Sequence, residues 1–272
     1  MSGPTLKSLG IYLRALRLPS FGAYHEEIGL QAEKEGWSFS QYLHHLAELE
    51  MNDRQVRRIE RLRTQSDLPA EKTLATLKLG RLPAAIQRQL PTLCEGGFVE
   101  RAENVLAFGM PGRGKTHLLC AIGHELIKGG RKVLFVPAYK LVQRLLAAKR
   151  DLTLEAAVRR LDSFDAVIVD DIGYIQHDRE EMEVLFTFLS ERYERRSVLI
   201  TSNLVFSQWD RIFKDPMTTA CAIDRLVHHA IILEIAGPSY RSEAAEERNK
   251  STTAAAKKAK SRARSAAATA HN

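Results

Sequence analysis

The sequence predicts a protein of the α/β class, built around a five-stranded, mostly parallel sheet. Five short apolar runs alternate with helical stretches between residues 69 and 243. Strands separated by helices pair in parallel, because each return to the sheet uses a crossover. Residues 1–68 show helical spacing and no strand-like run, while residues 244–272 lack aromatic residues. We therefore predict a small all-helical N-terminal domain, an α/β domain at 69–243 and a disordered basic tail.

The N-terminal region contains two clear helical patterns. Leucines at helical spacing predict a first helix that Pro19 ends: Leu6, Leu9, Leu13 and Leu16. Ser38 and Gln41 form a capping box that predicts the start of a second helix. On that helix we expect the side chains of Val56, Ile59 and Leu62 to pack inward. Residues 67–69 read as a linker to the next domain.

The α/β region supplies five predicted strands, at residues 105–108, 133–136, 166–169, 198–201 and 231–235. Two helices, at 140–149 and 154–161, are expected between the second and third strands. Strands buried on both faces read as continuous apolar runs, as these do.

Composition restricts the environment and the partners. The net charge of +7 favours a polyanionic partner, because surplus Lys and Arg raise association with phosphates. Cys94, Cys120 and Cys221 show no paired spacing, which argues against a disulfide framework or a zinc site. No apolar run approaches the ~18 residues of a membrane helix. We therefore expect a cytoplasmic protein.

A phosphate-binding loop follows the first predicted strand. Its glycines let backbone N–H groups approach a phosphate, and the N-terminus of the next helix adds a favourable dipole. Lys115 would reach the β- and γ-phosphates, and Thr116 would ligate Mg²⁺. The spacing of this Walker A pattern predicts a nucleotide site made of Gly109, Pro111, Gly112, Arg113, Gly114, Lys115, Thr116 and His117.

Polar residues end two later strands. Asp170 and Asp171 close the third strand, so Asp170 would hold Mg²⁺ and Asp171 would orient the attacking water. Alone, such a pair reads as a helix cap or a turn; its position after the loop and an intervening strand favours catalysis. Asn203 follows the fourth strand and either contacts the γ-phosphate or forms a turn.

The order of these motifs resembles the AAA+ ATPases, and finer segments resemble IstB-type transposition helpers, which are relatives of DnaC and DnaA. The resemblance covers nearly the whole chain to Arg241. It rests on the segments Gly-Lys-Thr-His-Leu (114–118), Val-Asp-Asp-Ile-Gly-Tyr (169–174), Arg-Tyr-Glu-Arg-Arg-Ser (192–197), Thr-Ser-Asn (201–203), Ala-Ile-Asp-Arg-Leu (222–226) and Gly-Pro-Ser-Tyr-Arg (237–241).

The resemblance implies roles for individual residues. Asp171 becomes the water-activating acid and Asn203 the sensor. Arg225 falls where this class supplies an arginine finger to a neighbouring subunit, although a surface ion pair with Asp224 is the alternative. Arg241 could be a second nucleotide-sensing arginine. Many AAA+ proteins carry Glu at the position of Asp171, and the shorter side chain implies slow hydrolysis.

Two basic sets are candidates for duplex DNA binding without strong sequence preference. Arg54, Arg57, Arg58 and Arg61 form one helix face, which more often is a solvated surface. The second set lies on the helix pair before the acidic strand, a pair that faces DNA in the DnaA branch. It comprises Lys140, Arg144, Lys149, Arg150, Arg159 and Arg160.

The resemblance implies an ATP- and Mg²⁺-dependent homo-oligomer on DNA that recruits a transposase. A DnaC-like loader acting on a replicative helicase is the alternative partner choice. From another class, a small-molecule phosphotransferase would need a substrate lid and a neutral or acidic surface. A module that binds ATP without hydrolysing it also stays open because of Asp171.

Overall fold

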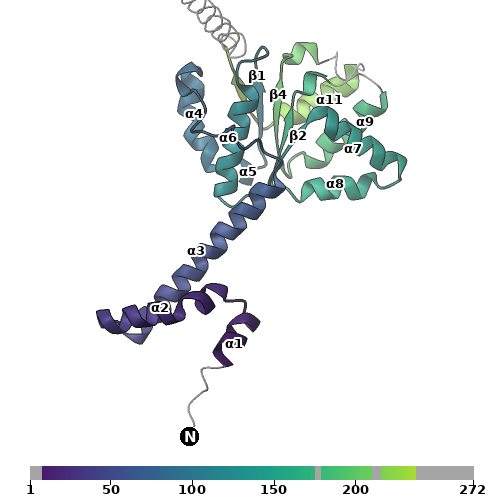
Figure 1. Ribbon diagram of the computed structural model, residues 1–272. Coiled ribbons are helices and arrows are strands. Elements are labelled where there is room, and N and C mark those ends of the chain that lie inside the picture. Colours follow the sequence, from purple (N-terminus) through teal and green to yellow (C-terminus); the bar gives the residue numbers. More distant parts are fainter. Residues whose placement is uncertain (1–7, 175–178, 210–215, 237–272) are drawn as a thin grey trace, which may run out of the picture. The chain divides into compact units, whose positions relative to one another are not determined.

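The computed structural model describes residues 8–174, 179–209 and 216–236, and the chain separates into two compact units (Figure 1). The first unit spans residues 1–64 and the second residues 65–272. This division falls a few residues before the boundary expected at 68/69, which stays a prediction. The predicted tail at 244–272 lies outside the described residues.

The first unit is helical, with α1 at Leu9–Ala15, α2 at Pro19–Glu35 and α3 at Phe39–Gln65. The Ser38 capping box is present at the start of α3: the Gln41 backbone N–H donates to Ser38 Oγ, and Ser38 N–H donates to Gln41 Oε1 at 2.8 Å. The role expected of Pro19 is wrong. The first helix stops at Ala15, and Pro19 occupies the first turn of α2, where its fixed φ and missing N–H are tolerated.

A buried carboxylate joins α2 to α3 inside this unit. Glu50 is 3% exposed and accepts a hydrogen bond from the backbone N–H of Ser20 at 2.8 Å. Arg54 donates to the same carboxylate at 2.7 Å. The inward packing expected of Val56 is wrong, because its side chain is 55% exposed while Leu62 is buried. Helical spacing alone therefore included one exposed residue, Val56, in the predicted inward-facing set.

The second unit holds five parallel strands, as predicted. They are β1 at Asn104–Phe108, β2 at Val133–Pro137, β3 at Ala166–Asp170, β4 at Ser197–Ser202 and β5 at Ala230–Glu234. Their order in the sheet is β2-β3-β4-β1-β5. β1 therefore lies between β4 and β5, and its carboxyl end meets those of its neighbours at one edge. In open parallel sheets this edge is where ligands bind.

Helices cover both faces of the sheet (Figure 1). On one side lie α4 at Ala84–Glu95, α5 at Gly97–Glu100 and α6 at Lys115–Lys128. On the other lie α7 at Ala138–Arg150, α8 at Leu154–Asp162, α9 at Arg179–Arg192 and α11 at Pro216–Val227. Short 3-10 turns occupy Leu79–Arg81, Ile172–Tyr174 and Phe206–Gln208. In the described part of the chain, no helix combines the length and apolarity needed to cross a membrane.

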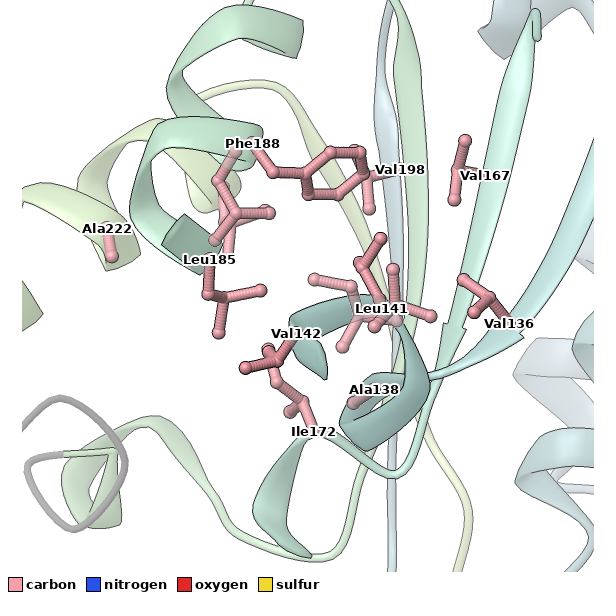
Figure 2. Close-up of a cluster of buried hydrophobic side chains, with 14 of the residues drawn as sticks. Val136, Ala138, Leu141, Val142, Val167, Ile172, Leu185, Phe188, Val198 and Ala222 are labelled. Carbon is pink, nitrogen blue, oxygen red and sulfur yellow. The ribbon is translucent and has the colours of Figure 1, made fainter. Parts of the chain in front are cut away.

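The core on the α7 and α9 side fixes the strands that carry the site (Figure 2). Leu141 of α7 and Phe188 of α9 pack with Val167 of β3 and Val198 of β4, and each is no more than 2% exposed. Close packing of this kind transmits shifts rather than absorbing them. The ends of β3 and β4 are therefore held at a defined spacing.

Candidate functional site

The loop between β1 and α6 has the backbone conformation that a phosphate cradle needs. Gly109, Gly112 and Gly114 have φ values of 153°, 79° and 90°, which favour glycine. A Cβ atom added to Gly109 would lie 2.5 Å from the Ile235 carbonyl oxygen, so only glycine fits beside the end of β5. The sequence therefore builds a loop whose backbone N–H groups are unobstructed, directly before the N-terminus of α6.

The Lys115 ammonium group lies inside this loop. Lys115 is 5% exposed, and its Nζ donates to the Gly109 carbonyl at 2.7 Å and the Met110 carbonyl at 3.2 Å. It also donates to Asn203 Oδ1 at the end of β4. Burying an ammonium group is costly unless oxygen acceptors surround it. The loop thus holds a positive charge at the position where a phosphate would approach.

Two hydroxyl groups converge on Asp170 at the end of β3. Thr116 Oγ1 donates to Asp170 Oδ1 at 2.8 Å, and Thr201 Oγ1 donates to the same oxygen at 2.7 Å. A carboxylate beside hydroxyl oxygens is the donor set that Mg²⁺ prefers. Thr116 and Asp170, which the sequence predicts as magnesium ligands, are therefore brought together, and these residues fit the ion.

Asp171 follows in a left-handed backbone conformation, with φ of 58°. Its backbone N–H donates to Thr201 Oγ1 at 2.7 Å, and its Oδ1 accepts from Asn203 Nδ2 at 3.3 Å. Asp is tolerated at positive φ more readily than most residues. Thr201 thus fixes both acids, a role that the sequence did not indicate because it depends on the pairing of β3 with β4.

The chain beyond β4 is fixed so that Asn203 faces Lys115. Ser202 Oγ accepts from the Leu204 backbone N–H at 3.0 Å. The indole of Trp209 is fully buried and donates to the Leu204 carbonyl at 3.2 Å. Such a turn orients Asn203 from both sides. Of the two sequence interpretations of Asn203, turn former or phosphate contact, the structure is compatible with both at once.

These groups surround a cavity of about 270 Å³. Five residues of the loop and the helix start line it: Pro111, Gly112, Gly114, Lys115 and Thr116. His117, Asp171 and Asn203 line it as well. The rest of the lining comes from Lys72, Thr76, Leu77 and Lys78, which the sequence did not indicate. Arg113 is half-buried and is absent from this lining.

Comparison with known proteins identifies the family of this chain. A family model described as IstB-like ATP binding protein matches residues 11–248. The chain is 44% identical over 240 residues to a putative insertion sequence ATP-binding protein of Sinorhizobium fredii, across 88% of this chain and 80% of that protein. The chain belongs to the IstB-like ATP-binding protein family.

Further relatives agree with this IstB membership. The insertion sequence IS21 putative ATP-binding protein of Pseudomonas aeruginosa is 35% identical over 236 residues, across 87% of this chain and 89% of the relative. Among solved structures, AMPPCP-bound DnaA from Aquifex aeolicus gives a TM-score of 0.52 at 20% identity, covering 63% of this chain and 51% of DnaA. DnaI gives 0.52 at 22% identity, covering 63% of this chain and 96% of DnaI. The chain matches about half of DnaA, and these likenesses show the AAA+ fold.

Arg225 of this IstB-family chain lies on α11, outside the lining of the pocket. Its Nη1 donates to Ser190 Oγ of α9, and its guanidinium carbon lies 4.8 Å from the centre of the Phe186 ring. These contacts hold the side chain against its own subunit. A finger role would require a neighbouring subunit, and it stays a prediction. Arg241 lies outside the described residues.

The two basic sets proposed to bind DNA, one on α3 and one on α7 and α8, differ in their ion pairs. In the first, Arg54 and Arg57 lie 2.7 and 3.6 Å from the buried Glu50 carboxylate, which gives both a structural role. In the second, Lys140, Arg144 and Arg150 are exposed on α7. Lys149 pairs with Glu183 of α9 at 2.8 Å, and Arg159 with Glu155 at 2.8 Å. Arg58, Arg61 and Arg160 are exposed.

Proposed function

We propose that this chain is an ATP-dependent helper of transposition that assembles on duplex DNA, recruits and stimulates a transposase, and hydrolyses ATP. The observation that carries the proposal is the hydrogen-bonded series Lys115, Asn203, Asp171 at the edge of the sheet, in a chain of the IstB family. A series linking a phosphate-binding lysine to a carboxylate suits a site that both binds and hydrolyses a nucleotide.

ATP binds in the cavity with its phosphates in the loop after β1. The backbone N–H groups of the glycine loop and the α6 N-terminus hold the anion. Lys115 supplies the balancing charge from a buried position, where electrostatic attraction is stronger than in water. The family of ATP-binding proteins to which the chain belongs supports ATP as the nucleotide.

Thr116 and Asp170 would hold Mg²⁺, which would neutralise part of the phosphate charge. The protein prepares this position through the two hydroxyl groups that share Asp170 Oδ1. Thr201, fully buried in β4, keeps the carboxylate oriented. Mg²⁺ needs near-ideal geometry, so a fixed carboxylate favours it over larger ions.

Asp171 and Asn203 act on the hydrolytic water. The Asp171 carboxylate accepts a proton from water as a general base, while Asn203 holds that carboxylate through its amide N–H. The left-handed backbone at Asp171 favours a short acid at this position. We infer that Asp suits this turn but, because its side chain is short, makes hydrolysis slow. Slow hydrolysis suits a switch.

Assembly brings Arg225 to the site of the next subunit. No arginine lines the pocket among the described residues, and its positive charge comes in cis from Lys115, Lys72 and Lys78. A guanidinium added from a neighbour would stabilise charge on the transferring phosphoryl group. Hydrolysis would then be tied to the oligomer, since one subunit alone lacks that group.

DNA contacts come from three exposed basic side chains of α7: Lys140, Arg144 and Arg150. Phosphate contacts of this kind give binding that tolerates sequence and weakens with salt. The relatives are named as insertion sequence ATP-binding proteins, which supports a transposase as the partner. The helical unit 1–64 is the proposed docking element for it.

The test is binding of the full chain to duplex DNA in ATP, in ADP and without nucleotide, followed by addition of the transposase encoded beside it. We expect assembly only with ATP, and retention of the transposase by that assembly. Equal binding in all three states would contradict the ATP-dependent switch. Retention of a replicative helicase in place of the transposase would favour the loader alternative.

A further inference from the structure

A segment of chain lies along α6 and reaches the nucleotide pocket. We call residues 66–78 the strap; it begins directly after α3, which ends at Gln65. The Ser66 carbonyl accepts from the Phe135 backbone N–H of β2 at 2.7 Å. Leu68 lies against Gly123 of α6, where an added Cβ would come within 3.3 Å of its methyl groups. The strap, which we expected to be a plain linker over 67–69, is therefore packed on the α/β unit.

Two histidines of α6 hold the strap at points two helical turns apart. His124 Nε2 lies 3.0 Å from the Pro69 carbonyl oxygen, and His117 Nε2 lies 3.1 Å from the Thr73 carbonyl oxygen. A carbonyl only accepts, so each Nε2 carries the proton and donates. His117 Nε2 also lies 3.1 Å from Thr76 Oγ1. His117 thus contacts the strap beside the pocket, whereas His124 contacts it away from the pocket.

The strap supplies positive charge to the pocket that Asp171 also lines. Lys72 lines the cavity together with Asp171 and Asn203, and it is half-buried. Lys72 also influences the pKa of the Cys120 thiol on α6. Burial raises that pKa to about 12, with the positive charge of Lys72 opposing the rise and the negative charge of Asp170 adding to it. The charges of Lys72 and Asp170 therefore both act on the Cys120 thiol.

We propose that Lys72 binds the terminal phosphate of ATP, and that His117 is a positioning residue that holds the strap, and with it Lys72, at the pocket. The inference deepens the proposed function and rests on it. Three observations carry it: the shared cavity lining, the His117 contacts with Thr73 and Thr76, and the separate anchor at His124. Lysine is a frequent phosphate ligand because its ammonium is a compact point charge.

The strap is covalently continuous with α3, so a nucleotide that engages Lys72 acts on the residues immediately following that helix. A ligand shifts a conformational equilibrium only through contacts that differ between the two states. A lysine that senses the terminal phosphate provides such a contact, since ATP has that phosphate and ADP lacks it.

The test measures binding of ATP and ADP separately, using fluorescent analogues of each with the full-length chain. We expect Lys72→Gln to weaken ATP binding by about tenfold, the loss of one hydrogen bond to a charged group, while ADP binding changes by less than about twofold. Lys72→Arg keeps the charge and should retain most of the ATP affinity. An equal loss for both nucleotides, or no loss, would overturn the assignment of Lys72.

The positioning role is tested with His117→Ala and His117→Gln. Gln can donate from the place of Nε2, so His117→Gln should restore the ATP-over-ADP preference that His117→Ala lowers. His124→Gln and His124→Ala are the matched pair, because they change the same kind of bond outside the pocket. They should leave the preference unchanged. A loss of preference in the His124 variants as large as in His117→Ala would make His117 merely structural and overturn its role.

The outcomes separate this inference from the proposed function. If wild-type protein binds ATP and Lys115→Ala does not, the ATP site stands whatever the strap variants do. If the wild type binds neither nucleotide, the proposed function itself fails. Unchanged ATP-over-ADP preference in Lys72→Gln, in a wild type that binds ATP, overturns the strap inference alone.

Discussion

Asn203 accepts a hydrogen bond from the Lys115 ammonium group through its side-chain oxygen. The amide nitrogen of the same side chain donates to Asp171 Oδ1 at 3.3 Å. One side chain therefore links the group that would hold the γ-phosphate to the acid that would act on water. An arriving phosphate competes with Asn203 for the Lys115 protons, so we expect the Asn203 amide to reorient when ATP binds.

Replacing Asn203 tests this link. We predict that Asn203→Ala lowers the hydrolysis rate by about 10- to 100-fold, the worth of a hydrogen bond to a charged group, while ATP affinity changes little. Phosphate release and nucleotide titration measure the two quantities. Ser202→Ala, which alters the adjacent turn, serves as the control for loop disruption. A large fall in ATP affinity with unchanged turnover would contradict the assigned role.

Asp171→Asn separates binding from hydrolysis. Asn tolerates the left-handed backbone at this position, so the substitution should fold normally while removing the base. We predict at least about a 100-fold loss of phosphate release, the usual contribution of a general base, with ATP binding retained. Turnover equal to that of an active wild type would contradict the role of Asp171 as the base. ATP binding without phosphate release by either protein would favour a module that binds ATP without hydrolysing it.

Arg225 is predicted to act between subunits. Arg225→Ala should lower hydrolysis by about a thousandfold, as expected for an arginine finger, with ATP binding by the single chain intact. Mixing Arg225→Ala with Asp171→Asn restores sites that combine Asp171 of one subunit with Arg225 of the next. An equal mixture should recover roughly a quarter of wild-type activity if subunits assort at random along a head-to-tail interface. No recovery would place Arg225 in its own subunit, where Ser190 and Phe186 hold it.

The α7 surface is predicted to contact DNA phosphates. Lys140→Ala with Arg144→Ala should weaken duplex binding for all sequences and reduce the salt slope of log affinity by about 1.8, or 0.9 for each lost contact. Lys149→Ala is the matched control on the same helix, because its ammonium group pairs with Glu183. If the control reduces the slope as much as the double variant, the effect is one of net charge and the surface assignment fails.

Local sequence patterns were sufficient to predict the strands of the sheet and the phosphate loop. Apolar runs located all five strands to within one or two residues, since buried parallel strands differ strongly from amphipathic helices. The helices at 138–150 and 154–162 were placed equally well. The Walker A spacing located Lys115 and Thr116 because the loop is encoded within eight consecutive residues.

Contacts between residues far apart in the sequence could not be predicted from local patterns. Thr201 forms hydrogen bonds with both Asp170 and Asp171 only because β4 pairs with β3. The strap reaches the pocket through His117, forty or more residues away in sequence, and no periodicity marks it. Glu50 is buried and engages Arg54, so part of an arginine stripe that resembled a DNA surface stabilises the first unit instead. Burial of a charge depends on partners that spacing does not show.

The most direct test of the account compares Lys115→Ala with wild type in sedimentation on duplex DNA with ATP. Lys128→Ala, at the far end of the same helix and paired with Glu125, is the control for lost positive charge. We predict that wild type and Lys128→Ala form large ATP-dependent assemblies on DNA, while Lys115→Ala neither binds ATP nor assembles. Full nucleotide affinity and normal assembly of Lys115→Ala would contradict the claim that capture of the triphosphate joins the subunits on DNA.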